Sequence, residues 1–164
     1  MEKDIIDTLI SDWKTERPEL DASAMSIVGR ILSLGKILEK RASSALCDIG
    51  ICYTDLDVLA TLRRSGAPYA LTPTELMQSV LITSGAMTAL LDRLTKLELI
   101  YRAVDEKDKR VKRAALTEKG IEIIDKAIEI RFQEALDATS TLNKSEQKQL
   151  SSLLKKMMAT IAVF

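Results

Sequence analysis

A run of six charged residues occupies positions 105–110, with the sequence Asp-Glu-Lys-Asp-Lys-Arg. Its cations, Lys107, Lys109 and Arg110, could contact DNA phosphates, although three acids in the same run cancel their charge. Zero net charge does not exclude nucleic-acid binding, because phosphate contacts depend on where individual Lys and Arg side chains face. An ordinary solvated turn would have much the same composition. The elements on either side of the run must distinguish these two interpretations.

The segment upstream of the charged run predicts an amphipathic helix that is capped by Thr83 or Ser84. Its apolar residues recur at helical spacing and form one stripe: Met87, Leu90, Leu91, Leu94 and Leu97. The opposite side has mostly small or polar residues: Gly85, Thr88, Ala89, Asp92 and Lys96. Small side chains allow a helix to enter the major groove of DNA, where hydroxyl groups can donate to phosphates or base edges. This face is typical of a recognition helix, although any pair of packed helices would share the apolar stripe.

A short helix and a hairpin are predicted on either side of this recognition helix. Thr72 at the N-cap, Pro73 at the first helical position and Glu75 three residues after the cap form a capping box that begins the short helix. Residues 97–104 predict a strand and residues 111–116 a weaker returning strand, so the charged run becomes the tip of a hairpin. A helix-turn-helix followed by a charged hairpin predicts a winged helix, with Arg110 as the favoured groove or phosphate contact.

Further helices are predicted on both sides of the winged helix. Apolar residues follow a helical period in three segments, at residues 5–13, 22–46 and 53–64. Thr117 caps another long helix, and Asn143 with Glu146 forms a second capping box that begins the last one. Little sequence remains to cover the apolar sides of the terminal helices. Helices of a second chain are therefore expected to complete their burial.

The composition argues against most kinds of enzyme and metal site. The chain has no histidine and only two cysteines, Cys47 and Cys52, which removes the commonest general base and the usual four-ligand zinc site. We expect no cofactor and no catalysis; a small carboxylate-based enzyme is the weakest alternative. No apolar run is long enough to span a bilayer, and the acidic N-terminus does not resemble a signal peptide. A cytoplasmic protein without membrane partners is the expectation.

The sequence resembles the MarR family of bacterial transcription regulators over nearly the whole chain, most strongly over residues 71–120. The tripeptide Asp108-Lys109-Arg110 is similar to the family's Asp-x-Arg wing signature, and the sequence LTEKG to the start of its following helix. The resemblance implies a homodimer held by N- and C-terminal helices, with Arg110 in the minor groove. It also implies DNA contacts at five positions of the recognition helix: Thr83, Ser84, Gly85, Thr88 and Arg93. Such regulators are usually repressors that a small ligand or oxidation releases from DNA.

The N-terminal segment resembles the urate-responsive branch of that family. The resemblance implies that Trp13 and Arg102 line a ligand pocket and that Asp57 is an acidic switch residue. The branch's fourth signature position, an arginine in the recognition helix, corresponds to Leu90, which belongs to the apolar stripe and cannot form the charged interaction. A related purine, or a phenolic or other aromatic anion, would suit Trp13 and Arg102 better than urate itself.

The expected fold is mainly α, a winged helix-turn-helix with a small β-hairpin wing, in a single domain of residues 1–164. Residues 53–117 form the DNA-binding region, and residues 1–48 and 118–164 the helical dimerisation region. Lys96, Lys107 and Lys109 add cations to the candidate DNA surface. The expected function is that of a homodimeric transcriptional repressor that binds double-stranded DNA. A small aromatic or anionic ligand is expected to release it from the DNA. The alternatives are a redox-sensing regulator that uses Cys47 or Cys52, and a helical protein-interaction module without DNA binding.

Overall fold

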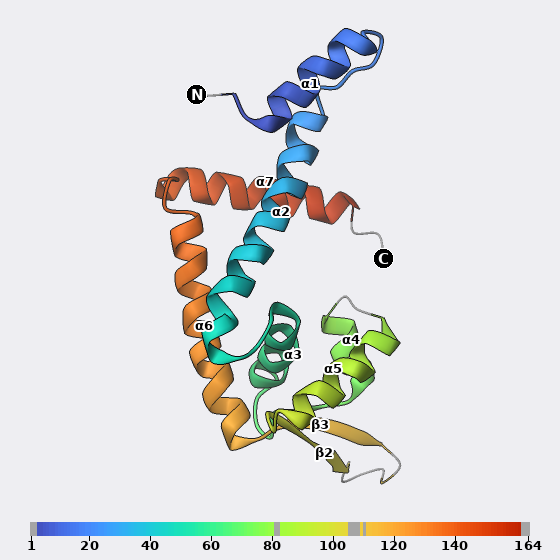
Figure 1. The fold of residues 1–164 in the computed structure, drawn as a ribbon, viewed down its shortest axis with the longest axis vertical. Coiled ribbons are helices and arrows are strands. Elements are labelled where there is room, and N and C mark those ends of the chain that lie inside the picture. Colours follow the sequence, from blue (N-terminus) through green and yellow to red (C-terminus); the bar gives the residue numbers. More distant parts are fainter. Residues whose placement is uncertain (1–2, 81–82, 105–108, 110, 162–164) are drawn as a thin grey trace. The chain divides into compact units, whose positions relative to one another are not determined.

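The computed structural model describes residues 3–80, 83–104, 109 and 111–161 of the chain. The chain forms two compact units, Met1–Ser44 and Ala45–Phe164, and each is described by itself. Helices dominate both units (Figure 1). This confirms the mainly α fold that the sequence predicts. Within the described residues, no helix combines the length and apolar character needed to cross a membrane.

The first unit contains α1 (Ile5–Glu16) and most of α2 (Met25–Leu46), whose last residues belong to the second unit. Helix α1 begins at Asp4, whose carboxylate accepts the N–H of Asp7 at 2.9 Å. Ile6 is buried against α2, and a Cβ atom built on Gly29 would lie 3.2 Å from its side chain. The glycine therefore allows the two helices to approach closely.

The second unit contains a small antiparallel sheet that packs against α3, α5 and α6, with the β2–β3 hairpin projecting at one edge (Figure 1). Its strands lie in the order β1-β3-β2, so the returning strand of the hairpin is central. Its elements are, in chain order, a 3-10 turn (Cys47–Ile49), α3 (Tyr53–Arg64), β1 (Ala70–Leu71), α4 (Pro73–Ser79), α5 (Ser84–Lys96), β2 (Ile100–Val104), β3 (Lys112–Leu116), α6 (Glu118–Ala138) and α7 (Lys144–Ile161).

The helix starts follow the capping residues that the sequence predicts. Helix α4 begins with the Thr72 capping box, in which the threonine hydroxyl accepts the N–H of Glu75 at 3.2 Å. Thr83 caps α5 by accepting the N–H of Ala86 at 3.4 Å, and Thr117 caps α6. Asn143 and Glu146 form the second capping box at the start of α7. These caps satisfy backbone donors that a helix start leaves without intrahelical partners.

One continuous core joins α3, α4, α5, the sheet and the first half of α6. Helix α3 lies at its centre and contacts α4, α5, α6 and β3. The core residues are mostly Leu, Ile, Val and Ala. The fully buried ones include Leu59, Leu62, Leu76, Leu91, Leu94, Ile100 and Ile124. The core thus fixes the two helices of the helix-turn-helix against the sheet.

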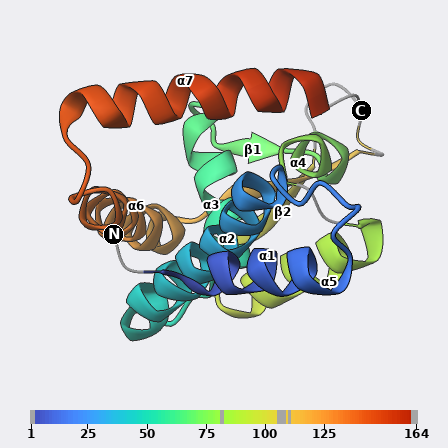
Figure 2. The same ribbon diagram turned by 90° about the horizontal axis from the view of Figure 1, so that it is seen from above.

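Helix α7 lies across the end of α6 rather than alongside it, as both views of the ribbon show (Figures 1 and 2). None of its residues is buried, although its apolar side chains recur at helical spacing. Leu150, Leu153, Met158 and Ile161 are each more than two-fifths exposed. This helix therefore presents an apolar side that the single chain leaves uncovered.

Candidate nucleic-acid interface

Helix α5 buries its apolar stripe and exposes its small and polar face. Met87, Leu90, Leu91 and Leu94 are buried, and they include the leucine that occupies the arginine position of the urate-responsive branch. The predicted DNA contacts Thr83, Ser84, Gly85, Thr88, Arg93 and Lys96 are all exposed. The Thr88 hydroxyl donates to the carbonyl of Ser84 at 3.1 Å, so its oxygen lone pairs remain directed outward. The structure thus brings these six residues together along α5 and its N-cap, all of them exposed.

The hairpin that follows α5 has the register expected for a wing. Strand β2 pairs with β3 from Ile100 opposite Leu116 to Val104 opposite Lys112. Strand β1 pairs with the other edge of β3, where Ala70 lies opposite Ala115. Lys109 is exposed, whereas the predicted contacts Lys107 and Arg110 lie outside the described residues.

The C-terminal part of α5 is tied to the wing by an exposed ion pair. Asp92 accepts from Arg102 of β2, with 3.0 Å between the Arg102 Nη2 and the Asp92 Oδ1. The two side chains are 31% and 60% exposed for Arg102 and Asp92. Exposed pairs of this kind typically contribute about 0–1 kcal/mol to stability. Arg102, predicted as a ligand contact, therefore has a structural partner on the recognition helix.

The next residue along α5, Arg93, forms an ion pair with α3 whose acid is buried, unlike the exposed acid of the Asp92–Arg102 pair. Its Nε lies 3.2 Å and 3.3 Å from the two carboxylate oxygens of Asp55, and its Nη2 lies 3.2 Å from Asp55 Oδ2. The Asp55 side chain is completely buried, while the Arg93 side chain is 52% exposed. Asp55 Oδ2 also accepts the N–H of Cys52 at 2.9 Å, at the start of α3. Asp55 thus joins the first turn of α3 to the recognition helix.

Sequence reasoning missed Asp55 and singled out Asp57 two residues later. Asp57 is half-buried on the same helix, and its carbonyl accepts the Thr61 hydroxyl at 2.7 Å. A signal for Asp55 was present, because an acid three residues after an N-cap is the spacing of a capping box. Removing Arg93 would leave the buried Asp55 carboxylate without its countercharge, and such a loss typically costs about 3–5 kcal/mol.

Trp13 belongs to the first unit, on α1, and is 53% exposed. It is the only tryptophan of the chain, and it follows Ile5 and Leu9 at intervals of four residues, both of which are also exposed. The two cysteines of the redox alternative, Cys47 and Cys52, are exposed as well.

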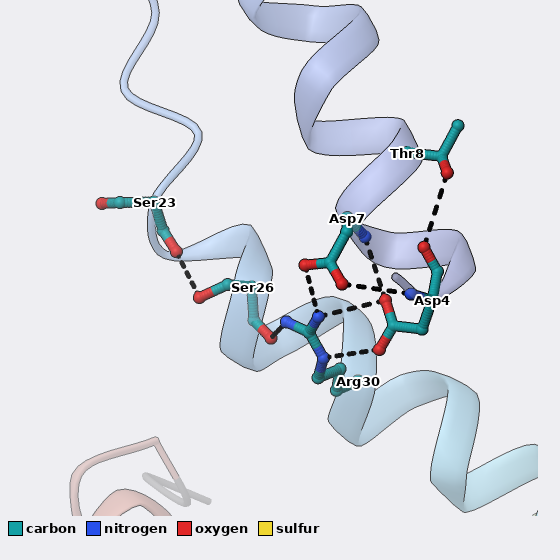
Figure 3. Close-up of polar contacts among 6 residues, drawn as sticks. All are labelled: Asp4, Asp7, Thr8, Ser23, Ser26 and Arg30. Carbon is teal, nitrogen blue, oxygen red and sulfur yellow. Dashed lines mark hydrogen bonds and ion pairs between the residues drawn. The ribbon is translucent and has the colours of Figure 1, made fainter. Parts of the chain in front are cut away.

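A cluster of charges in the first unit fixes the start of α1 to α2 (Figure 3). The Arg30 guanidinium donates to both oxygens of Asp4 at 2.8 and 3.0 Å and to Asp7 at 2.7 Å. A fourth contact joins its Nη1 to the carbonyl of Ser26 at 2.8 Å. The N–H of Asp7, and then Arg30, hold the pKa of the Asp4 carboxyl below its usual value. The hydrogen bonds that Arg30 donates to Asp7 and Asp4 likewise raise the pKa of Arg30.

Known proteins share both this sequence pattern and this fold. A family model described as MarR family matches residues 49–111, from the end of the 3-10 turn to the start of the returning strand. The HTH-type transcriptional regulator PecS of Dickeya dadantii is 28% identical over 152 residues, which cover 93% of this chain and 92% of PecS.

Solved structures with this fold include transcriptional regulators with and without DNA. A cysteine-to-serine mutant of MarR from E. coli, complexed with operator DNA, is 26% identical with a TM-score of 0.73, over 85% of this chain and 99% of that one. The organohalide-sensing regulator RdhR, bound to 2,4-dichlorophenol, is 22% identical with a TM-score of 0.74, over 87% of this chain and 82% of that one. The matched segment, the near full-length relative and the shared fold together make this chain similar to winged-helix transcriptional regulators of the MarR family.

Proposed function

We propose that this chain is a homodimeric repressor that reads operator DNA with α5 and the hairpin wing. The observation that carries the proposal is the division of α5 into a buried apolar stripe and an exposed face of small and polar residues. The operator complex of the similar MarR chain supports DNA as the partner. In this proposal residues 53–117 form the DNA-binding region, and its contacts are Thr83, Ser84, Gly85, Thr88, Lys96, Lys107, Lys109 and Arg110.

Dimerisation is proposed through the terminal helices, residues 1–48 and 118–164. In the first unit, Leu32 and Ile37 of α2 are 61% and 53% exposed. In the second unit, Phe132 of α6 is 66% exposed, and the apolar side of α7 is uncovered along its length. Monomeric proteins rarely expose apolar patches that extend this far, so a second copy of the chain is the partner that we propose.

The effector is proposed to be a small aromatic or anionic molecule that contacts Trp13, Asp57 and Arg102. An exposed indole ring offers stacking to a flat ring, and a guanidinium offers charge-assisted hydrogen bonds to an anion. The fold itself accommodates a phenolic ligand in the RdhR structure. Release from DNA follows if the effector binds the DNA-free conformation better than the DNA-bound one.

Fluorescence anisotropy tests the DNA-binding part of the proposal. Purified protein is titrated into a labelled duplex from the region upstream of its own gene, and into a scrambled duplex of equal length, at several salt concentrations. We expect tighter binding to the first duplex. We also expect the logarithm of the binding constant to fall linearly with the logarithm of the salt concentration. Equal affinity for both duplexes, without a salt dependence, would favour the protein-interaction module instead.

Light scattering tests the dimer. We expect a mass of about twice the chain mass of 18.2 kDa for the wild type. Leu153→Glu should shift the mass towards the monomer, because it places a charge on the uncovered apolar side of α7. Ser152→Glu, the adjacent exposed position, is the matched control and should leave the dimer intact.

Quenching of Trp13 fluorescence tests the effector in the same preparations. Urate, xanthine and salicylate are added in turn, and each is also added to the preformed DNA complex. We expect one compound to quench Trp13 and to release the duplex over the same concentration range. Quenching without release would separate ligand binding from repression and contradict the proposed switch.

A further inference from the structure

The pair formed by Asp55 and Arg93 has a feature that a DNA-contacting arginine does not need. Two of the three guanidinium nitrogens of Arg93 are directed at a carboxylate that is completely buried in the second unit. A phosphate contact requires a guanidinium that faces outward with its charge available. In this geometry the charge of Arg93 is already matched by that of Asp55.

The pair is located where it can set the orientation of the recognition helix, α5. Arg93 lies in the last turns of α5 (Ser84–Lys96), whereas Asp55 lies in the first turn of α3. The neighbouring residue Asp92 ties the same part of α5 to β2 through Arg102. The C-terminal part of α5 is thus held from two sides, by α3 and by the wing. The position of the exposed N-terminal part of α5, with Thr83 and Thr88, depends on these anchors.

We propose that Arg93 is a positioning residue, which sets the orientation of α5 through Asp55, rather than a phosphate contact. This inference rests on the proposed function, because it concerns how the same helix is presented to DNA. To reach a phosphate, the guanidinium would have to leave Asp55 and abandon a buried carboxylate without its countercharge, which is strongly unfavourable. Asp55 therefore retains Arg93 when DNA binds, and the exposed Lys96, one turn further along α5, is free to contact phosphate instead.

The salt dependence of DNA binding separates the two roles. A side chain that neutralises one phosphate adds about 0.9 to the slope of log K against log salt concentration, whereas a positioning residue changes affinity at all salt concentrations alike. Affinities for the upstream duplex are measured by anisotropy at four or more salt concentrations. The proteins compared are the wild type, Arg93→Ala, Arg93→Gln, Asp55→Asn and, as the matched cation on the same face, Lys96→Ala.

We expect Arg93→Ala to weaken binding about tenfold or more with the salt slope of the wild type. Arg93→Gln, which keeps a donor for Asp55 but has no charge, should recover part of the lost affinity. Lys96→Ala should instead reduce the slope by about 0.9. Asp55→Asn should weaken binding, because it removes the anchor; circular dichroism establishes that each variant is folded at the temperature of the titration.

Two results would overturn the inference. The first is a slope that falls by about 0.9 in Arg93→Ala, which is the result for a phosphate contact. The second is tighter binding by Asp55→Asn, which would mean that Asp55 competes with DNA for the guanidinium. Either result leaves the proposed function intact, because the wild type still binds. A wild type without salt-dependent, sequence-selective binding would instead overturn the proposed function, and the inference with it.

Discussion

The Arg30 cluster of the first unit and the Asp55–Arg93 pair of the second each join two helices through one guanidinium. Their nitrogen–oxygen distances are similar, from 2.7 to 3.0 Å in the first and from 3.2 to 3.3 Å in the second. The acids differ in burial: the side chains of Asp4 and Asp7 are 47% and 40% exposed, whereas that of Asp55 is 0% exposed. Water can replace a lost partner in the first case and not in the second.

This difference indicates that contact distance alone does not set the strength of an ionic anchor between two helices. Exposed carboxylates are hydrated when their partner leaves, and salt screens the interaction. A buried carboxylate has no such alternative, so its arginine is held whatever approaches from solvent. The pair in the winged helix is therefore suited to fixing the recognition helix, and the cluster in the first unit to an adjustable contact between α1 and α2.

The largest effect on stability is expected from removing the partner of the buried acid. Arg93→Ala should lower the free energy of unfolding by about 3–5 kcal/mol, because it leaves the buried Asp55 carboxylate without its countercharge. Urea denaturation measures the loss. Asp92→Ala, which breaks the exposed pair on the same helix, should cost about 0–1 kcal/mol. Equal losses in the two variants would contradict the distinction between the pairs.

A smaller effect is expected at Gly120, where α6 lies against the residue that precedes β2. A Cβ atom on Gly120 would lie 2.0 Å from the carbonyl oxygen of Leu99, which also accepts the N–H of Thr117 at 3.1 Å. Gly120→Ala should therefore cost about 1–3 kcal/mol through a forced backbone shift.

The control for this change is Gly35→Ala in α2. Nothing lies within 4 Å of a Cβ atom at Gly35, so alanine should stabilise the helix by up to about 1 kcal/mol. Thermal melts of the two variants should therefore move in opposite directions. A decrease of similar size in both would show that the first unit is packed as tightly as the winged helix.

The smallest effect on stability is expected in the first unit, when low pH protonates Asp4. Because the pKa of Asp4 is lowered from its usual 3.8, its contribution is complete above that pH and is lost as pH falls through the lowered pKa. The start of α1 should therefore loosen only below about pH 4. Trp13 emission, followed from about pH 6 to pH 2, reports the change. In Arg30→Gln the change should begin at higher pH; identical curves would show that the Asp7 N–H alone sets the pKa.

The sequence predicted the helices well because their apolar residues repeat at helical spacing and four of the helices, α4 to α7, begin with a recognisable cap. Helix α3 occupies Tyr53–Arg64, as its period indicates, and α4, α6 and α7 begin directly after their predicted caps. Strand β1 was not predicted. It has only two residues, Ala70 and Leu71, so it shows no alternation and is defined by its pairing with β3.

The candidate site was predicted in part for the same reason. The exposed face of α5 follows from helical periodicity, which also places Leu90 in the core. The pairing of Asp55 with Arg93 joins residues 38 positions apart and results from the packing of α3 on α5. No local pattern encodes that contact, and the acid of a capping box has an ordinary local role in any helix.

A double-mutant cycle on operator affinity tests most directly whether the buried pair presents a DNA-reading helix. The wild type, Asp55→Asn, Arg93→Ala and the double variant are titrated with the upstream duplex at one salt concentration. We predict that the wild type binds the duplex selectively and that the double variant is no weaker than the weaker single variant, because both changes remove one interaction. Losses that add in the double variant would show that Asp55 and Arg93 act independently on DNA binding and would contradict this account.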